Sequence, residues 1–245
     1  MKRVKCTVSY DGSRFAGYQV QPGQRTVQQE IEKALAALHK GRPVKTAASG
    51  RTDAGVHAMG QVVHFDTDLS IPETSWPAAL NSLLPGDISV SAAAYAGPGF
   101  HARYSVKEKE YRYRIYFSHV RSPFKHRYAL RVWFPLDTGA MEAAANAVLG
   151  THDFTSFCSA KTEAEDRVRT LKEIRFLRQD DELVICFKGN GFLYNMVRIL
   201  TGTLLEIGSG KREPGEMREI LEKRNRIYAG KTAPPEGLYL WKVTY

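Results

Sequence analysis

Hydrophobic and polar residues follow two different spacings along the first part of the chain, and these spacings predict strands and helices. Alternation with a period of two predicts strands at residues 4–10, 61–66 and 88–95. Apolar residues at helical spacing predict helices over 27–38 and 76–84. Thr26 is expected to be the N-cap of the first helix, with Gln29 three residues later as in a capping box.

The second part of the chain resembles the first in its order of elements, without a sequence repeat. Alternating patterns predict strands at residues 110–117, 170–177, 183–188 and 238–243. Helical patterns cover residues 140–149, 192–207 and 214–224. The strands on either side of residues 179–181 are expected to form a hairpin, and such pairing favours an α+β fold with antiparallel sheets. We expect two α+β halves, residues 1–104 and 105–245.

The composition of the chain is typical of a soluble globular protein. Of its 245 residues, 43% are hydrophobic and 11% aromatic. No apolar run approaches the roughly 18 residues that a membrane-spanning helix needs. The basic first residues are not followed by the apolar stretch of a secretory signal. The sequence therefore predicts a cytoplasmic protein that does not enter a membrane.

The cysteines and histidines show no metal-binding or disulfide pattern. The three cysteines, Cys6, Cys158 and Cys186, lie far apart, and the seven histidines do not fall at ligand spacings. We expect no metal site and no disulfide framework, and we expect reduced thiols that are partly buried as small hydrophobic side chains.

The net charge of +9 favours a polyanionic partner. Basic and aromatic residues are interleaved over one stretch, with the cations Arg103, Lys107, Lys109, Arg112 and Arg114 and the rings of Phe100, His101, Tyr104, Tyr111, Tyr113 and Tyr116. Cations that hold phosphates beside rings that stack on bases are typical of surfaces that bind single-stranded or looped RNA. The alternative is that these aromatic residues only pack within a strand.

A loop around Asp53 carries the strongest candidate chemistry. Asp53 is the only acid in residues 50–58, with Arg51 two residues before it and Gly55 two residues after it. Glycines let the backbone turn tightly and approach a ligand closely. An adjacent arginine favours the ionised carboxylate and can orient it. The alternative is an aspartate that caps a turn.

Several motifs in this sequence resemble those of one enzyme family. The matching segments are residues 10–19, 25–28, 50–58, 100–104, 111–113, 152–158, 192–198 and 232–238. Together they closely resemble the bacterial tRNA pseudouridine synthase A family, nearly from end to end and in the family's order. Two departures are small: Tyr18 stands where many members have tryptophan, and Tyr194-Asn195 replaces a common pair of histidines.

The resemblance implies an isomerase that converts uridine to pseudouridine in the anticodon stem-loop of tRNA, at tRNA positions 38, 39 and 40. Asp53 is then the catalytic carboxylate. The N1–C1′ bond breaks, the uracil turns while bound, and C5 joins C1′, so no cofactor is implied. Asp53 could attack C1′ or C6 as a nucleophile, or act as a base at the 2′ position. The sequence does not choose among these routes.

The resemblance also implies roles for three further residues. Arg198 corresponds to the ion-pair partner of the catalytic aspartate, although by itself it would be taken for a solvated helix arginine. Tyr111 corresponds to an active-site tyrosine that lies against the target uracil, with strand packing as the alternative. Arg51 corresponds to a residue that enters the space left by the flipped nucleotide, with an ion pair to Asp53 as the alternative.

The remaining implications concern RNA contacts, architecture and assembly. Phe100, His101, Arg103 and Tyr104 match positions that contact tRNA in the family, whereas Asp153, Phe154 and Phe157 are expected to shape the pocket. The fold implied is a pair of ferredoxin-like halves with antiparallel sheets joined around a central cleft, the pseudouridine synthase fold. The resemblance further implies a homodimer.

Two rival functions remain open at this point. A hydrolase of N-glycosidic bonds would also need a carboxylate near C1′, but glycosidases generally use two carboxyl groups. The next acids along the chain, Asp66 and Asp68, lie on or beyond the following strand. A non-catalytic RNA-binding module would use the basic and aromatic residues and would not need Asp53.

Overall fold

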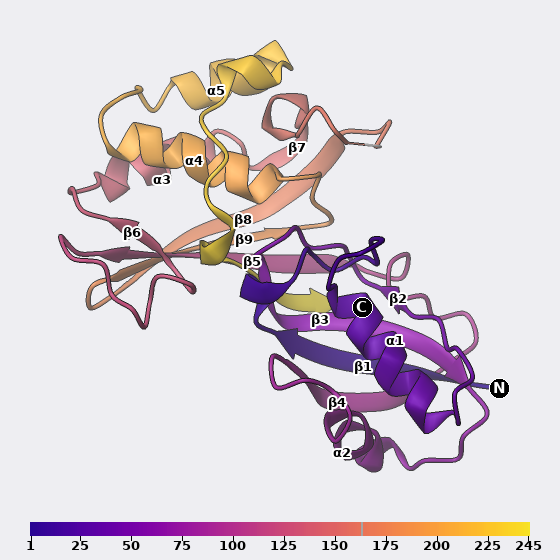
Figure 1. The fold of residues 1–245 in the computed structure, drawn as a ribbon. Helices are drawn as coiled ribbons and strands as arrows, with labels where there is room; N and C mark the ends of the chain where they lie inside the picture. The colour runs from indigo at the N-terminus through magenta and orange to yellow at the C-terminus, as the bar shows by residue number, and fades with distance from the viewer. Residues whose placement is uncertain (163) are drawn as a thin grey trace. The chain divides into compact units, whose positions relative to one another are not determined.

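The computed structural model describes residues 1–162 and 164–245, which form two compact units (Figure 1). Unit 1 consists of residues 1–107 and 239–245, and unit 2 consists of residues 108–238. This division differs from the expected halves, 1–104 and 105–245, mainly in the last strand. Tyr239 and Leu240 pair with His57 and Ala58 of unit 1, so the end of the chain packs with its beginning.

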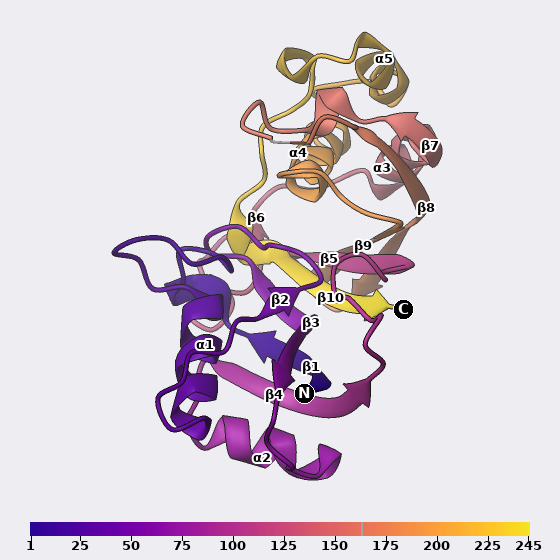
Figure 2. The same cartoon turned by 90° about the vertical axis from the view of Figure 1, so that its right-hand side faces the viewer.

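Unit 1 is a sheet with helices on one face (Figure 2). Its strands are β1 (Lys2–Tyr10), β2 (Ala47–Ala48), β3 (His57–Thr67), β4 (Ile88–Ala96) and β10 (Leu238–Thr244). They are ordered β4-β1-β3-β10, with β2 also on β3. The pairs around β1 are antiparallel, whereas β10 and β3 are parallel.

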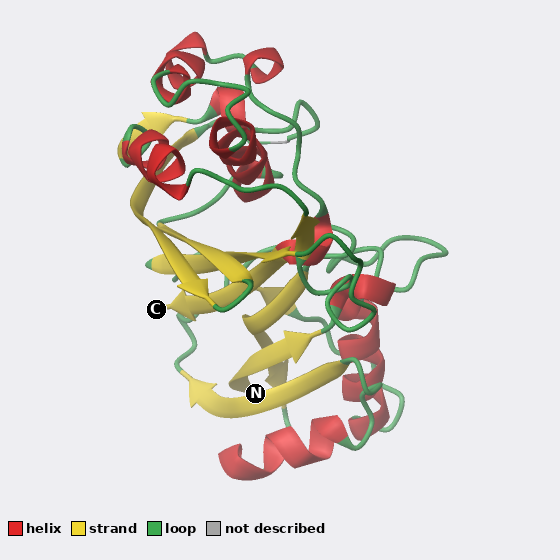
Figure 3. Ribbon diagram, turned by 90° about the vertical axis from the view of Figure 1, so that its left-hand side faces the viewer, coloured by secondary structure: helices red, strands yellow, loops and turns green. Residues whose placement is uncertain are grey.

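Helices α1 (Val27–Leu38) and α2 (Trp76–Asn81) cover this sheet, as Figure 3 shows. The predicted stripe of α1 is confirmed, since Val27, Ile31 and Leu35 are buried. The capping prediction is wrong in its detail. Thr26 precedes α1 in an extended conformation, but its side chain caps nothing and its buried hydroxyl has no hydrogen-bond partner among the described residues. Backbone carbonyls take the place of a side-chain cap, because the Val27 and Gln28 N–H groups donate to Gly17 and Tyr18 at 3.2 and 2.9 Å.

The described residues of unit 2 combine five β-strands with three α-helices. Its strands are β5 (Glu108–Phe117), β6 (Leu130–Val132), β7 (Gly150–Asp153), β8 (Val168–Gln179) and β9 (Glu182–Gly189). They are ordered β5-β9-β8-β7, and β6 pairs with β5 in parallel. The helices are α3 (Thr138–Asn146), α4 (Met196–Gly208) and α5 (Glu216–Lys223). They lie on one side of β8 and β9 (Figure 1). The predicted hairpin and the α+β class are confirmed.

Helix α4 begins later than its apolar pattern predicts. The pattern starts at residue 192, but the first helical residue is Met196. Asn195 has a φ of 61°, in the left-handed region where a residue cannot continue a right-handed helix. The segment before it is therefore a loop that packs Leu193 into the core.

The cysteine side chains and the helix lengths are further features of the described residues. Cys6, Cys158 and Cys186 are all buried, and their thiols are free. Within the described residues, each helix is too short or too polar to span a bilayer.

Candidate active site

The loop that carries Asp53 is anchored by buried hydrogen bonds. The hydroxyl groups of Tyr10 and Thr52 lie 2.8 Å apart, and Gln61 donates to the Gly50 carbonyl at 2.8 Å. The Ser49 hydroxyl donates to the Gln61 amide oxygen at 2.6 Å. These contacts fix both sides of the loop from the sheet beneath it, because β1 supplies Tyr10 and β3 supplies Gln61.

Two glycines bring a neighbouring segment against this loop. Gly17 has a φ of +107°, and a β-carbon there would lie 2.9 Å from the Thr52 carbonyl oxygen. A β-carbon on Gly12 would lie 2.0 Å from the Val56 carbonyl oxygen. The Tyr18 N–H donates to the Thr52 carbonyl at 3.0 Å. Residues 12–18 therefore hold the Asp53 loop from outside, and the two contacts require glycine at positions 12 and 17.

Asp53 itself is half-buried between the buried residues Thr52 and Val56. Its carbonyl accepts a hydrogen bond from the Val56 N–H at 3.1 Å, which closes a tight turn. Arg51 is exposed on the same loop. A single carboxylate on a rigid, glycine-flanked turn is suited to act as a nucleophile or a base toward a bound ligand.

The predicted RNA-contacting residues of unit 1 form an aromatic cluster. The rings of His101 and Tyr104 lie 4.4 Å apart, and Arg103 lies 5.9 Å from the centroid of Tyr104. Phe100 packs against Tyr245 at 4.9 Å. Tyr104 is 77% exposed. The cluster thus presents an outward ring and an adjacent cation, the combination that stacks on an unpaired base and holds a phosphate.

Histidines and backbone groups brace this cluster from below. The N–H groups of Arg103 and Tyr104 donate to Nδ1 of His101, at 3.1 and 3.4 Å. The Ala102 N–H donates to Nδ1 of His64 at 3.1 Å. Burial, together with the charges of Arg3 and His101, lowers the pKa of His64. A neutral His64 keeps the acceptor that this contact requires.

The RNA-surface interpretation fails for part of β5. Tyr113 and Tyr116 are fully buried, so their rings cannot stack on a base. Arg112 donates to Glu110 at 2.7 Å, and Arg114 donates to Glu182 at 2.7 Å. Strand packing and ion pairing, rather than RNA contact, account for these four side chains.

Tyr111 is also part of the β5 packing. Its side chain is 8% exposed and meets Phe192 edge to face, with ring centroids 5.0 Å apart. Both residues belong to unit 2, as does Arg198, whereas Asp53, Arg51 and the cluster at residues 100–104 belong to unit 1.

The guanidinium of Arg198 is held in a defined orientation within unit 2. Its Nε donates to the Ala233 carbonyl at 2.7 Å, and its Nη1 donates to the Asn195 side-chain oxygen at 2.9 Å. The Ala233 N–H donates in return to the Arg198 carbonyl at 3.0 Å. Asn195 can do this because its left-handed backbone, which asparagine tolerates, turns its amide toward the first turn of α4.

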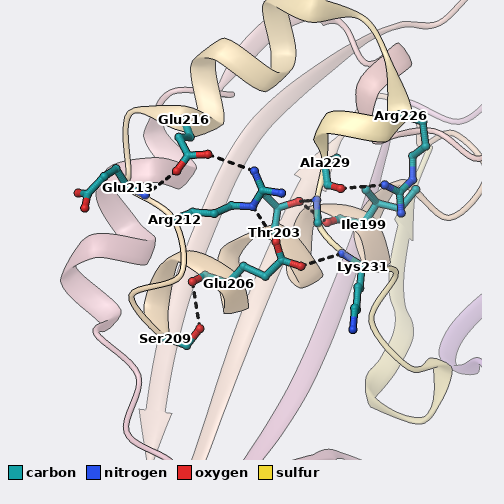
Figure 4. Close-up of polar contacts among 11 residues, drawn as sticks. Ile199, Thr203, Glu206, Ser209, Arg212, Glu213, Glu216, Arg226, Ala229 and Lys231 are labelled. Carbon is teal, nitrogen blue, oxygen red and sulfur yellow. Dashed lines mark hydrogen bonds and ion pairs between the residues drawn. The ribbon is translucent and has the colours of Figure 1, made fainter.

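The segment that ends at Ala233 is fastened along α4. The Gly230 N–H donates to the Thr203 hydroxyl at 3.0 Å, and the Lys231 N–H donates to Glu206 at 3.0 Å. A β-carbon on Gly202 would lie 1.7 Å from the Lys231 carbonyl oxygen, so the two chains touch directly. Figure 4 shows Thr203, Glu206 and Lys231 in this arrangement. The same segment thereby fixes the acceptor that orients Arg198.

Glu206 is the centre of the network in Figure 4. Arg212 donates to Glu206 at 2.6 Å and to Glu216 at 3.1 Å. Burial acts to raise the pKa of Glu206, but the hydrogen bonds from Arg212 and Lys231 hold it below its usual value. An ionised Glu206 thus joins the end of α4, the start of α5 and the segment beside Arg198.

The motif at residues 152–158 has a structural role in unit 2. Phe154 and Phe157 are fully buried. Asp153 accepts hydrogen bonds from the backbone and hydroxyl groups of Thr155, at 2.9 and 2.6 Å. The Ser156 hydroxyl accepts from the Asn225 N–H at 2.8 Å. This motif anchors the chain beyond α5 against the core.

Sequence reasoning missed several residues that support the candidate site. Tyr10, Thr52 and Gln61 lie within or beside the matching motifs, but nothing in their spacing predicts a shared network. Asn195 could have been found from its residue type, because an asparagine next to a helix end often caps the helix or adopts a left-handed backbone. Among the described residues, no three histidine, cysteine or acidic side chains come together as a metal site would require.

Comparison with known proteins finds a matching family model and relatives that align with the whole chain. A family model described as tRNA pseudouridine synthase matches residues 7–105 and 144–245. The chain is 57% identical to tRNA pseudouridine synthase A 1 of Bacillus cereus (strain ATCC 10987 / NRS 248), over 100% of this chain and 99% of that protein. It is 55% identical to tRNA pseudouridine synthase A of Geobacillus sp. (strain WCH70), over 100% of this chain and 98% of the relative.

Proposed function

Because this chain belongs to the tRNA pseudouridine synthase family and is an isomerase that makes pseudouridine, we propose that it acts on the anticodon stem-loop of tRNA, at tRNA positions 38, 39 and 40. The observation that carries the proposal is the full-length match to synthases of the A type together with an intact motif around Asp53. The hydrogen-bonded loop that fixes Asp53 supports it.

In this proposal Asp53 is the catalytic carboxylate. The N1–C1′ bond of uridine breaks, the detached uracil turns, and a C5–C1′ bond forms, while C5 loses a proton and N1 gains one. The carboxylate acts on C1′ or C6 as a nucleophile, or on the 2′ position as a base. A carboxylate held by a rigid turn needs little reorganisation for any of these steps.

Arg198 and Tyr111 complete the proposed chemistry. Arg198 is the proposed ion-pair partner of the catalytic carboxylate, since a guanidinium beside a carboxylate favours the ionised form. Tyr111 is the proposed ring that lies against the uracil and keeps it in the site while it is detached. Stacking of this kind contributes about 1–3 kcal/mol per base.

The proposed RNA contacts lie in unit 1. Arg51 enters the space that the flipped nucleotide leaves, where a planar cation offsets the loss of stacking. Phe100, His101, Arg103 and Tyr104 contact the tRNA, and the exposed Tyr104 ring beside Arg103 supports this role. We further propose a cytoplasmic homodimer.

The test is to incubate the pure protein with unmodified tRNA transcripts and to map pseudouridine base by base. Pseudouridine at positions 38 to 40 is the expected result. Pseudouridine only outside the anticodon arm would reject the proposed location. Release of free uracil would favour the hydrolase instead, and binding without any base change would favour a non-catalytic module.

A further inference from the structure

Residues 118–134 leave the end of β5 and return beside it as β6, forming what we call the excursion. Its two ends are fixed, because the Ser118 N–H donates to the Val132 carbonyl at 3.0 Å and Arg131 donates to the His119 carbonyl at 2.9 Å. Inside it, the Ser122 N–H donates to the Tyr116 hydroxyl at 3.3 Å. The excursion is therefore a shaped surface attached to the sheet of unit 2.

The charge of the excursion has a single sign. It contains Arg121, Lys125, Arg127 and Arg131, and it contains no aspartate or glutamate. Lys125 is bound by Asp181 at 2.7 Å. The three arginines are exposed. An exposed cluster of arginines fits a polyanion, since guanidinium groups bind phosphate in a bidentate manner.

Large apolar side chains are exposed among these arginines. Phe124 is 86% exposed and Trp133 is 60% exposed. Trp133 lines a hollow of about 340 Å³ together with His119 and Arg178. Rings that face solvent beside cations are suited to stack on unpaired bases.

A second copy of this chain would fit the excursion poorly. A symmetric interface would bring the same positive residues of both copies close together, and like charges oppose such contact. We propose that the excursion is an additional tRNA-binding surface, in which Arg121, Arg127 and Arg131 contact phosphates and Phe124 and Trp133 stack on bases. The proposal rests on tRNA as the substrate and adds a contact from unit 2.

Salt dependence of binding tests the arginines. Full-length tRNA is bound to the wild-type protein and to R121Q/R127Q over a series of KCl concentrations. Log K for tRNA binding falls as log salt rises, and each lost phosphate contact makes this slope shallower by about 0.7–0.9. The slope of the double variant should therefore be shallower by about twice that amount. R218Q is the matched control, because Arg218 is an exposed arginine paired with Glu222 on α5. Its slope should equal that of the wild type.

Fluorescence and affinity test the rings. Added tRNA should quench the emission of Trp133, and the quenching should be absent from W133F. F124A should weaken tRNA binding by about tenfold, as expected when one stacked base is lost. I227A is the control, since Ile227 is 75% exposed elsewhere on unit 2. Its affinity should stay at the wild-type value.

The proposal is overturned if R121Q/R127Q keeps the wild-type salt slope. Sedimentation provides a second test. If F124A or R121Q/R127Q converts a dimer to a monomer while the salt slope of tRNA binding is unaltered, the excursion is a subunit interface and the proposal is overturned. Failure of the proposed function is a separate outcome, seen as wild-type protein that binds tRNA but places no pseudouridine in the anticodon arm.

Discussion

Two neighbouring stretches of this chain have the same interleaving of cations and rings, yet they differ in what the rings do. At residues 100–104 the Tyr104 ring faces solvent beside Arg103. In β5 the ring of Tyr113 is buried, and the Tyr113 hydroxyl donates to the Pro234 carbonyl at 2.8 Å. The difference arises from context, because residues 100–104 form a turn after Gly97-Pro98-Gly99, whereas β5 lies between two other strands.

The two stretches also differ in the groups that contact their arginines. Arg112 and Arg114 of β5 have carboxylate partners in Glu110 and Glu182. Arg103 lies over an aromatic ring instead. The same basic and aromatic pattern therefore leaves a ring exposed where the backbone is a turn and buries it where the strand lies between two others.

The largest expected difference between the two stretches is in stability. Y113A should lower the free energy of unfolding by about 3–5 kcal/mol, because it removes a buried ring and leaves a cavity. Y104A should change it by less than about 0.5 kcal/mol, since the ring is exposed. Urea denaturation of both variants measures this. Equal losses for the two tyrosines would contradict the contrast in burial.

The reverse order is expected for RNA affinity. Y104A should weaken tRNA binding by about 1–3 kcal/mol through the loss of one stacked base. Y228A is the control, because Tyr228 is partly exposed near α5 and packs beneath Lys223. Titration of labelled tRNA measures both. If Y104A binds like the wild type, the ring is not a stacking surface.

A smaller effect is expected from the two arginines. R103A should make the fall of log K with log salt shallower by about 0.7–0.9, as expected for the loss of one phosphate contact. R112A should leave the slope unchanged, because Glu110 already binds that guanidinium. Binding over a KCl series gives both slopes. An unaltered slope for R103A would remove Arg103 from the RNA contacts.

The smallest effect concerns the turn that carries the exposed cluster. Arg3 donates to Asp66 at 2.7 Å and to the Phe100 carbonyl at 2.8 Å, so this pair braces the turn. The hydrogen bond from Arg3, against a smaller opposing effect of burial, lowers the pKa of Asp66. D66N should lower stability at pH 7 by about 0.2–1 kcal/mol, as for a surface ion pair.

This effect should depend on pH in a defined direction. The folded-state pKa of Asp66 lies below its unfolded value, so its stabilisation is present above that unfolded value and is lost as the pH falls through the folded-state pKa. The unfolding free energies of the wild type and D66N should therefore converge in acid. A difference that persists at low pH would show that the variant acts through something other than charge.

Local patterns predicted most of the fold. The stripe of α1 and the hairpin of β8 and β9 follow directly from spacing. The short strands β2, β6 and β7 were missed, because two to four residues carry too little periodicity. The start of α4 was placed too early, because an apolar pattern does not reveal the left-handed conformation of Asn195.

The candidate site was predictable as a set of motifs but not as a set of contacts. The motif around Asp53 is continuous in the chain, and its glycines indicated a turn. One acceptor for Arg198 is the carbonyl of Ala233, 35 residues away in the sequence. A backbone carbonyl carries no residue-specific signal, so only the packing of residues 229–233 on Gly202 and Thr203 could reveal it.

In the proposed mechanism one carboxylate, Asp53, performs the isomerisation. Its most direct test is D53N, with D68N as a control at an exposed acid that pairs with Arg42. Pseudouridine in tRNA is measured under single-turnover conditions, and tRNA affinity is measured alongside. We predict that D53N forms no pseudouridine, binds tRNA like the wild type and remains folded, while D68N is fully active. Conversion of uridine by D53N at the wild-type rate would contradict the account.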